Sequence, residues 1–91
     1  MLLRQLEYIV AVDRYRSFTQ AADVCCVTQP TLSQQIKVLE DYLAVEIFNR
    51  GQIPIRPTQR GQQIIERAQL VIAEARGLEQ FAKELVNQEL Q

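Results

Sequence analysis

Two closely spaced helix starts constrain this chain more than any other feature of its sequence. Ser17-Phe-Thr-Gln20 has serine and glutamine three residues apart, as in a capping box at the start of a helix. Thr28 is a second N-cap shortly afterwards, and Pro30 fits the first turn of the helix that follows. The first of these helices must therefore end near Cys26. A short helix, a tight turn and a longer helix form a helix-turn-helix.

The longer helix, Thr28 to Leu43, is predicted to have one apolar and one polar face. Apolar residues recur at steps of four, three and four, which places them on one side: Leu32, Ile36, Leu39 and Leu43. The other side carries Pro30, Ser33, Gln34, Lys37 and Asp41. From Thr28 to Lys37 there are three glutamines, three hydroxyl residues, one lysine and no acid. The adjacent acids Glu40 and Asp41 are predicted to be solvated on the helix surface.

The acid-free start of this helix has two interpretations. Amide and hydroxyl groups match the hydrogen-bonding edges of bases, and a helix N-terminus attracts phosphate. The alternative is an ordinary amphipathic helix with a solvated polar face. The capped short helix before it favours nucleic-acid binding, and the small Ala22 allows the two helices to cross closely.

The sequence resembles the N-terminal domain of LysR-type bacterial transcription regulators over roughly residues 1–88. The resemblance rests on segments 17–22 and 27–33, and on single positions that follow in order without gaps: Ile36, Leu39, Glu40, Leu43, Phe48, Arg50, Thr58 and Gly61. Segment 27–33 is most similar to that of the hydrogen-peroxide-sensing activators. The resemblance implies a mainly α fold: a winged helix-turn-helix of three helices and a short β-hairpin wing in residues 1–57, then a long linker and dimerisation helix in residues 58–91.

The same resemblance implies sequence-specific binding of double-stranded DNA, with helix 28–43 in the major groove. Contacts with base edges are expected from Gln29, Pro30, Thr31, Ser33 and Gln34. Contacts with the phosphate backbone are expected from Thr19, Thr28, Ser33, Lys37, Arg50 and Arg56. Members of the family often have arginine at position 34, so glutamine there is expected to weaken contact with phosphate or guanine.

The segment Glu46 to Pro57 predicts a two-stranded hairpin, which is the wing in such a domain. Ile47, Phe48 and Ile55 are apolar β-formers, and Gly51-Gln52 marks the turn. The wing tip is assigned to Gln52 and Ile53. Family members commonly have an arginine at the tip that enters the minor groove, so the apolar Ile53 leaves minor-groove binding open.

The first helix is predicted to span residues 2–15. Its buried stripe is expected to contain Leu2, Leu3, Leu6, Ile9 and Val10, with Tyr8 and Val12 as additions. The helix 28–43 is expected to end at Ala44-Val45. Family members usually have glycine at position 44, so alanine is expected to make this turn slightly costlier.

Thr58 is expected to cap a last helix that runs to about residue 88. Such a helix of ~30 residues would be ~45 Å long. Its apolar residues form an unbroken heptad seam: Ile64, Ala68, Val71, Ala75, Leu78, Ala82 and Leu85. Ile65 and Ile72 form a second stripe that is expected to face the domain's own core. Because a small domain cannot cover so long a helix, the seam predicts a homodimer, and the resemblance favours antiparallel pairing.

Composition excludes several other classes of protein. The 91 residues are 47% hydrophobic and 23% charged, as in one small globular domain. No secretory signal and no apolar run of membrane-spanning length is present, so a cytoplasmic location is expected. The net charge of −1 means that DNA affinity must come from local placement of charge. With no histidine and no glycine-rich phosphate loop, we expect no enzyme, no cofactor and no metal site.

Three further expectations concern the cysteines, an alternative function and the assembly of the protein. The adjacent Cys25 and Cys26 cannot form a disulfide framework and are interpreted as small fillers, in the core and at the turn respectively. The alternative function is a helical protein-interaction module with a coiled-coil arm, which explains the seam but not the acid-free helix. The resemblance implies a homodimer on an inverted-repeat DNA site, or a tetramer of a longer protein. In that protein a C-terminal domain after residue 91 would bind the effector.

Overall fold

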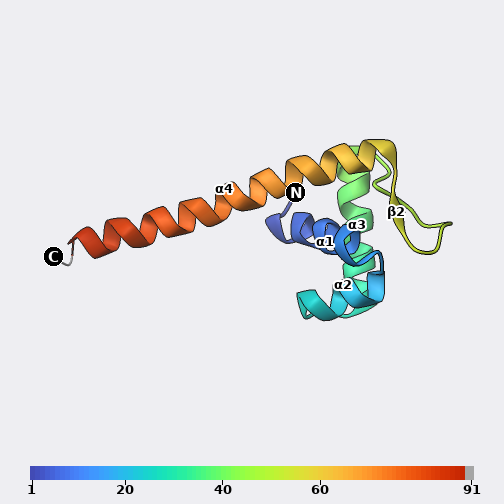
Figure 1. Cartoon of the computed structure of the whole chain (residues 1–91), viewed down its shortest axis with the longest axis horizontal. Coiled ribbons are helices and arrows are strands. Elements are labelled where there is room, and N and C mark those ends of the chain that lie inside the picture. Colours follow the sequence, from blue (N-terminus) through green and yellow to red (C-terminus); the bar gives the residue numbers. More distant parts are fainter. Residues whose placement is uncertain (90–91) are drawn as a thin grey trace.

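The computed structural model describes residues 1–89 as four helices and one hairpin. In chain order these are α1 (Leu3–Tyr15), α2 (Phe18–Cys25), α3 (Gln29–Leu43), β1 (Phe48–Asn49), β2 (Arg56–Pro57) and α4 (Gln59–Glu89). The molecule measures 56 × 25 × 20 Å, because α4 projects far beyond the body formed by the other elements (Figure 1). The predicted winged helix-turn-helix with a long last helix is confirmed. Residues 90 and 91, the end of the predicted segment 58–91, lie outside the described residues.

Side-chain caps and a left-handed turn produce the helix-turn-helix. Ser17 Oγ accepts the Gln20 N–H at 3.1 Å, and Thr28 Oγ1 accepts the Thr31 N–H at 3.4 Å, so both predicted N-caps are present. After α2, Cys26 has a φ of 60°. The Val27 N–H then donates to the Ala22 carbonyl at 3.0 Å, which reverses the chain before α3.

A single apolar core joins all four helices and the hairpin. Its fully covered side chains include Ile9, Val12, Ala21, Leu32, Ile36, Leu39, Ile47, Phe48 and Ile65. Tyr8 and Val12 belong to it, as predicted for α1. The prediction was wrong for Leu2 and Leu3, which are 60% and 38% exposed. They are the N-cap and first residue of α1, and this end of the helix lies beyond the edge of the core.

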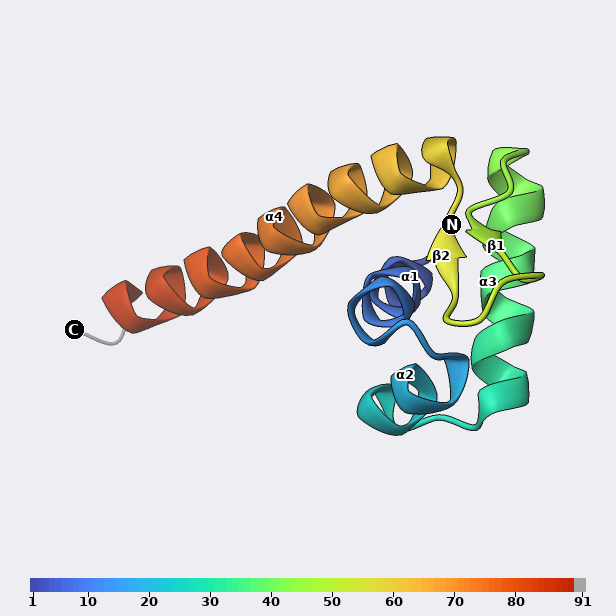
Figure 2. The same ribbon diagram turned by 45° about the vertical axis from the view of Figure 1, so that its right-hand side comes forward.

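The wing is a minimal antiparallel hairpin. Phe48 pairs with Pro57 and Asn49 pairs with Arg56, and proline cannot donate a ladder hydrogen bond, so the strands are short. The Thr58 N–H donates to the Ile47 carbonyl at 2.8 Å and ties the end of the wing to its start. Figure 2 shows the hairpin beside α3 and leading directly into α4. This arrangement places the wing beside α3 and at the start of α4.

The end of α3 has the strain that its sequence predicts. Ala44 is the C-cap residue, with φ 57° and ψ 38°, a left-handed conformation that favours glycine. The Val45 N–H donates to the Glu40 carbonyl at 3.1 Å and directs the chain toward β1. The side chain at position 44 therefore makes this turn costlier, as expected.

The long helix α4 is covered by the domain along only its first part. Thr58 Oγ1 accepts the Gly61 N–H at 2.9 Å, which confirms the predicted cap. Ile65 and Ile72 are 0% and 7% exposed, so the predicted inner stripe is confirmed. Ala68, assigned to the dimer seam, is only 3% exposed, because its place between Ile65 and Ile72 turns it toward the same core. Ala68 is thus corrected from a seam residue to a core residue, and Ile64 is half-buried against that core.

Candidate nucleic-acid interface

The polar side chains at the start of α3 and the first wing arginine enclose an open hollow on the surface. Its volume is about 450 Å³, and it is lined by Gln29, Pro30, Ser33, Gln34, Lys37 and Arg50. Five of these residues come from α3 and Arg50 follows β1. No acid lines the hollow, and two cations do. All six are among the predicted DNA-contact residues, and the fold brings Arg50 of the wing to the predicted contacts on α3.

The remaining predicted contacts on the helix-turn-helix lie outside this hollow. Thr28 Oγ1 donates to Thr31 Oγ1 at 2.8 Å and also accepts the Thr31 N–H, so both hydroxyls take part in the cap. The Thr31 methyl group and the O–H donor of its hydroxyl are then left for other contacts. Thr19 is exposed on the first turn of α2. Ser33 is half-buried, whereas Gln29, Pro30 and Gln34 are exposed.

Arg56 lies in a second open hollow, at the junction of the wing and α4. The volume is about 460 Å³, and the lining residues are Arg16, Arg56, Pro57, Thr58, Gln59, Gln62 and Gln63. Arg16 was not among the DNA contacts predicted from the sequence. Its Nη2 lies 3.2 Å from Asp13 Oδ1, and its Nε donates to the Asp13 carbonyl at 2.8 Å. Arg16 and Arg56 approach each other only through the tertiary fold, which explains why local sequence patterns did not reveal the cluster.

The wing tip consists of one polar residue, Gln52, and one apolar residue, Ile53, and carries no charge. Ile53 is 98% exposed, and Gln52 beside it is also exposed. The Gly51 N–H donates to Asn49 Oδ1 at 3.1 Å and stabilises the turn before the tip. Figure 1 shows the loop of the hairpin projecting away from the start of α4. An isoleucine with almost no protein contact is therefore available to an outside partner.

Glu40 corrects one prediction of the sequence analysis. It was expected to be solvated, but it is only 4% exposed. Its carboxylate accepts the Ile47 N–H at 2.7 Å and the Phe48 N–H at 3.3 Å, and it pairs with Arg50 Nη1 at 2.8 Å. Glu40 follows Ile36 by four residues, so it lies on the apolar side of α3, and that spacing was the missed signal. Asp41 is exposed as expected; its ion pair with Lys37, at 3.4 Å, is of the weak surface kind.

The outward side of α4 carries a row of exposed apolar side chains. Val71, Leu78 and Leu85 of the predicted seam are 41%, 66% and 45% exposed. Ala75 is half-buried and Ala82 is exposed. Three large apolar residues that were not predicted as part of the seam are exposed beside it: Leu70, Phe81 and Val86. From Leu78 onward the apolar residues recur at steps of three, one, three and one, which is the broader stripe of a helix that packs against another helix.

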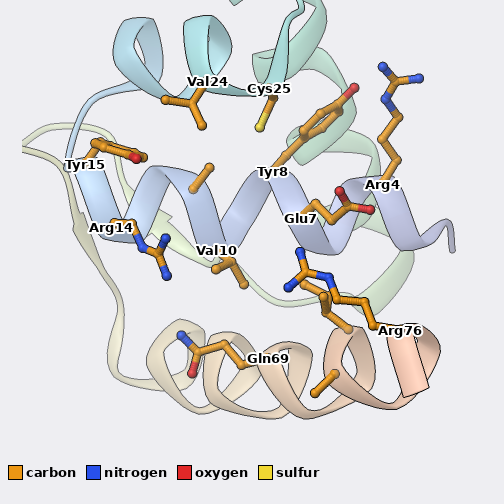
Figure 3. Close-up of a pocket in the computed structure, with 13 residues that line it drawn as sticks. Arg4, Glu7, Tyr8, Val10, Arg14, Tyr15, Val24, Cys25, Gln69 and Arg76 are labelled. Atoms are coloured by element: carbon orange, nitrogen blue, oxygen red, sulfur yellow. The ribbon is translucent and has the colours of Figure 1, made fainter. Parts of the chain in front are cut away.

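A larger hollow lies between α1, α2 and α4, on a different part of the surface. Its volume is about 750 Å³, and none of the predicted DNA-contact residues lines it. Figure 3 shows Val24 and Cys25 reaching toward α1 from α2, and Gln69 and Arg76 lying on α4 across the groove. Burial, followed by the charge of Glu7, raises the pKa of the Cys25 thiol. Less of the Cys25 thiol is therefore ionised, which makes it a poor nucleophile and agrees with a role in packing.

The part of the chain that the structure describes has neither a metal-binding cluster nor a membrane-spanning helix. Within residues 1–89, no group of His, Cys, Asp or Glu side chains has the arrangement of a metal site. No helix in the same range is long and apolar enough to cross a membrane.

Comparison with known proteins identifies the family. Residues 3–62 match the family described as "Bacterial regulatory helix-turn-helix protein, lysR family". The hydrogen peroxide-inducible genes activator of Pectobacterium carotovorum subsp. carotovorum is 43% identical over 84 residues, which are 92% of this chain and 28% of that protein. This chain thus spans little more than a quarter of the length of such relatives.

Solved structures agree with the sequence relatives. The structure of the BenM DBD with benA site 1 DNA has a TM-score of 0.90 at 36% identity, over 94% of this chain and 97% of that one. Full-length OxyR from Pseudomonas aeruginosa has a TM-score of 0.89 at 42% identity, over 92% of this chain and 28% of that one. The helix-turn-helix, the wing and the long α4 all have counterparts in proteins of one class. The chain therefore belongs to the LysR family of bacterial regulatory helix-turn-helix proteins.

Proposed function

We propose that this chain binds double-stranded DNA in a sequence-specific manner, as the DNA-reading part of a transcription regulator. In this proposal α3 lies in the major groove, and base edges are contacted by Gln29, Pro30, Thr31, Ser33 and Gln34. Glutamine can form two hydrogen bonds with adenine, and the Pro30 ring and Thr31 methyl suit the methyl group of thymine. The observation that carries the proposal is the acid-free hollow that joins the start of α3 to Arg50.

The phosphate backbone is held by residues that flank this base-reading surface. We assign this role to Thr19, Thr28, Ser33, Lys37, Arg50 and Arg56. Such contacts fix the position of the protein without reading sequence. They also explain how a chain with a net charge of −1 can bind DNA, because two cations and no acid line the hollow. The structure of the BenM DBD with DNA, which shares the fold at 36% identity, supports DNA binding by a domain of this shape.

Dimerisation completes the proposed DNA-binding unit. Residues 1–57 would form the DNA-binding domain, and residues 58–91 the linker and dimerisation segment. The exposed apolar side chains of α4 form a row, and such rows on a protein surface often mark a site of protein–protein contact. Most of the row lies beyond the part of α4 that packs against the domain. Two copies that pair through Val71, Ala75, Leu78, Ala82 and Leu85 would present two α3 helices to one duplex. Because the pair is symmetric, its site is an inverted repeat.

The proposal includes the setting in which this unit works. The family consists of regulators, and we propose that this chain is a non-enzymatic module that acts in the cytoplasm. In the longer protein, a C-terminal domain would bind the effector, and the dimers could associate into a tetramer. A protein-interaction module with a coiled-coil arm would explain the exposed side of α4. It would not explain why every residue that lines the hollow is a predicted DNA contact.

A binding titration tests the proposal. Fluorescence anisotropy would be followed for the chain with a labelled duplex, between about 50 and 200 mM salt, where phosphate-dependent affinity falls steeply. Lys37→Ala is expected to weaken binding and to flatten the salt dependence. Lys83→Ala is the matched control, because it removes the same charge from the exposed, distal part of α4. Equal effects of the two substitutions, or an affinity that does not respond to salt, would contradict the proposal.

A further inference from the structure

Glu40 joins α3 to the wing through three hydrogen bonds. One carboxylate oxygen, Oε2, accepts the backbone N–H groups of Ile47 and Phe48 at 2.7 and 3.3 Å. The other, Oε1, accepts Arg50 Nη1 at 2.8 Å. The Glu40 side chain is 3% exposed, whereas that of Arg50 is 35% exposed. The carboxylate is thus inside the protein, and the guanidinium it binds is at the surface.

Arg50 is held from a second side by an aromatic ring. Its Cζ lies 5.4 Å from the centre of the Phe18 ring, and this ring packs edge-on against Phe48 at 6.0 Å. The position of Arg50 is therefore set by α2, α3 and β1 together. Within residues 1–89, its one side-chain hydrogen bond is to Glu40. Its other N–H groups have no partner within these residues, and Arg50 lines both the hollow with Gln29 and Lys37 and a neighbouring hollow with Asp41 and Glu46.

We infer that Glu40 is a positioning residue, which fixes Arg50 at the DNA-facing hollow so that its free N–H groups bind a phosphate. The inference rests on the proposed DNA-binding function. Arginine suits this bridging role because its planar guanidinium has five donors, so it can bind a carboxylate and a phosphate at once. Glu40 itself touches no DNA in this scheme; it acts through Arg50.

The inference predicts an effect of unusual sign. Removing an acid from a DNA-binding domain should by charge alone strengthen its attraction to phosphates. If Glu40 positions Arg50, removing its charge should weaken binding instead. A merely electrostatic role and a positioning role therefore give opposite results in the same experiment.

Glu40→Gln is the most informative substitution. The amide oxygen of glutamine can still accept the Ile47 and Phe48 N–H groups, so the wing keeps its backbone anchor. The amide NH2 group then faces the Arg50 guanidinium, and two donors cannot pair. Glu46→Gln is the matched control, because it is the same chemical change at an exposed acid in the connection between α3 and β1.

The measurement is the affinity of the full 91-residue chain for a labelled duplex across a salt series. We expect Glu40→Gln to weaken binding roughly tenfold, as loss of a charge-assisted hydrogen bond would. The slope of log affinity against log salt should fall by about one, as for the loss of one phosphate contact. Arg50→Ala should have the same effect, and Glu46→Gln should leave the slope unchanged. Tighter binding by both Glu→Gln variants would overturn the inference.

A double substitution separates positioning from a general structural role. If Glu40 acts through Arg50, then Glu40→Gln combined with Arg50→Ala should bind no worse than Arg50→Ala alone. A further loss of affinity in the double variant would contradict the inference. Circular dichroism and thermal melting would show whether each variant is folded.

Arg50→Lys provides the test if Glu40→Gln does not fold. Lysine keeps the charge and can still pair with Glu40, but it lacks the fork that reaches a second anion. For Arg50→Lys the slope of log affinity against log salt should fall by about one, and an unchanged slope would overturn the inference. Failure of the unmodified chain to bind any duplex would contradict the proposed function as well, whereas normal binding with tighter Glu40→Gln would contradict this inference alone.

Discussion

Gly61 of α4 lies directly against the carbonyl group of Ile47. A Cβ atom at position 61 would come within 2.8 Å of the Ile47 Cα atom and would overlap the carbonyl itself. Thr58 connects the same two elements, because its N–H donates to the Ile47 carbonyl at 2.8 Å and its Oγ1 accepts the Gly61 N–H at 2.9 Å. The start of α4 is thus fixed to the start of the wing by close backbone packing.

This contact predicts opposite effects of one substitution at two positions in α4. Gly61→Ala should destabilise the chain by about 1–3 kcal/mol, because backbone atoms must move apart. Gly77→Ala should stabilise it by up to ~1 kcal/mol, because a Cβ there has no atom within 4 Å and alanine is the better helix former. Urea denaturation at a fixed protein concentration measures both changes. Similar destabilisation by the two substitutions would show that the glycine at 61 is not required by its contact.

The two cysteines should differ in reactivity. Burial, and then the charge of Glu7, raises the Cys25 pKa above its ordinary value of 9.0. Less thiolate is then present at a given pH, so in a Cys26→Ser variant Cys25 should be alkylated more slowly when folded than in urea. Because the folded pKa is the higher one, this thiol favours folding below pH 9.0 and loses that contribution as the pH rises further. Equal alkylation rates in the folded and unfolded states would count against the burial of Cys25.

Local signals in the sequence predicted the helices and turns. Ser17 and Thr28 are caps because a hydroxyl before a helix meets its free N–H groups, whatever the rest of the chain does. The cap at Thr58 was predicted on the same ground, whereas the costlier turn at Ala44 was predicted from the resemblance, because family members usually have glycine there. The residues that line the α3 hollow were also predicted: Pro30, Ser33, Gln34 and Lys37 share one polar face of the helix, whereas Gln29 and Arg50 were assigned from the family resemblance.

Features that depend on packing between elements were less accessible. Glu40 looks like a surface acid until the wing supplies two backbone N–H groups that need an acceptor. Ala68 fits the heptad seam, but the body of the domain covers that part of α4 and places it in the core. Whether a helix side faces its own domain or solvent depends on where the domain ends, and periodicity alone does not contain that information.

The exposed side of α4 predicts that a charge at its centre separates the dimer. Leu78 is 66% exposed in the protomer, so Leu78→Glu should leave the fold intact. In a dimer the same glutamate would be an unpaired buried charge, which is costly. Sedimentation velocity should show a monomer that binds DNA poorly. Gln80→Glu adds the same charge two residues away, about 160° from Leu78 around the helix, and should remain dimeric; an unmodified chain that is monomeric at micromolar concentrations would refute the pairing.

The wing tip predicts a gain of function. Ile53 is 98% exposed and uncharged, so Ile53→Arg should not disturb the fold. If the tip reaches a narrow minor groove, the new arginine should strengthen binding to duplexes with A·T-rich flanks more than to those with G·C-rich flanks. Anisotropy titrations on the two duplexes measure this difference. An equal gain on both, or no gain, would show that the tip stays outside the minor groove.

The most direct test of the central claim is selection of bound sequences from a random duplex pool by the unmodified chain and by Gln29→Ala. The account predicts that the unmodified chain enriches a two-fold symmetric inverted repeat, because two α3 helices read two half-sites. Gln29→Ala should enrich the same repeat with preference relaxed at one base step in each half-site, where a bidentate contact is worth ~1–3 kcal/mol. An unchanged site for Gln29→Ala would remove Gln29 from the base contacts, and the absence of any enriched sequence for the unmodified chain would contradict sequence-specific recognition by α3.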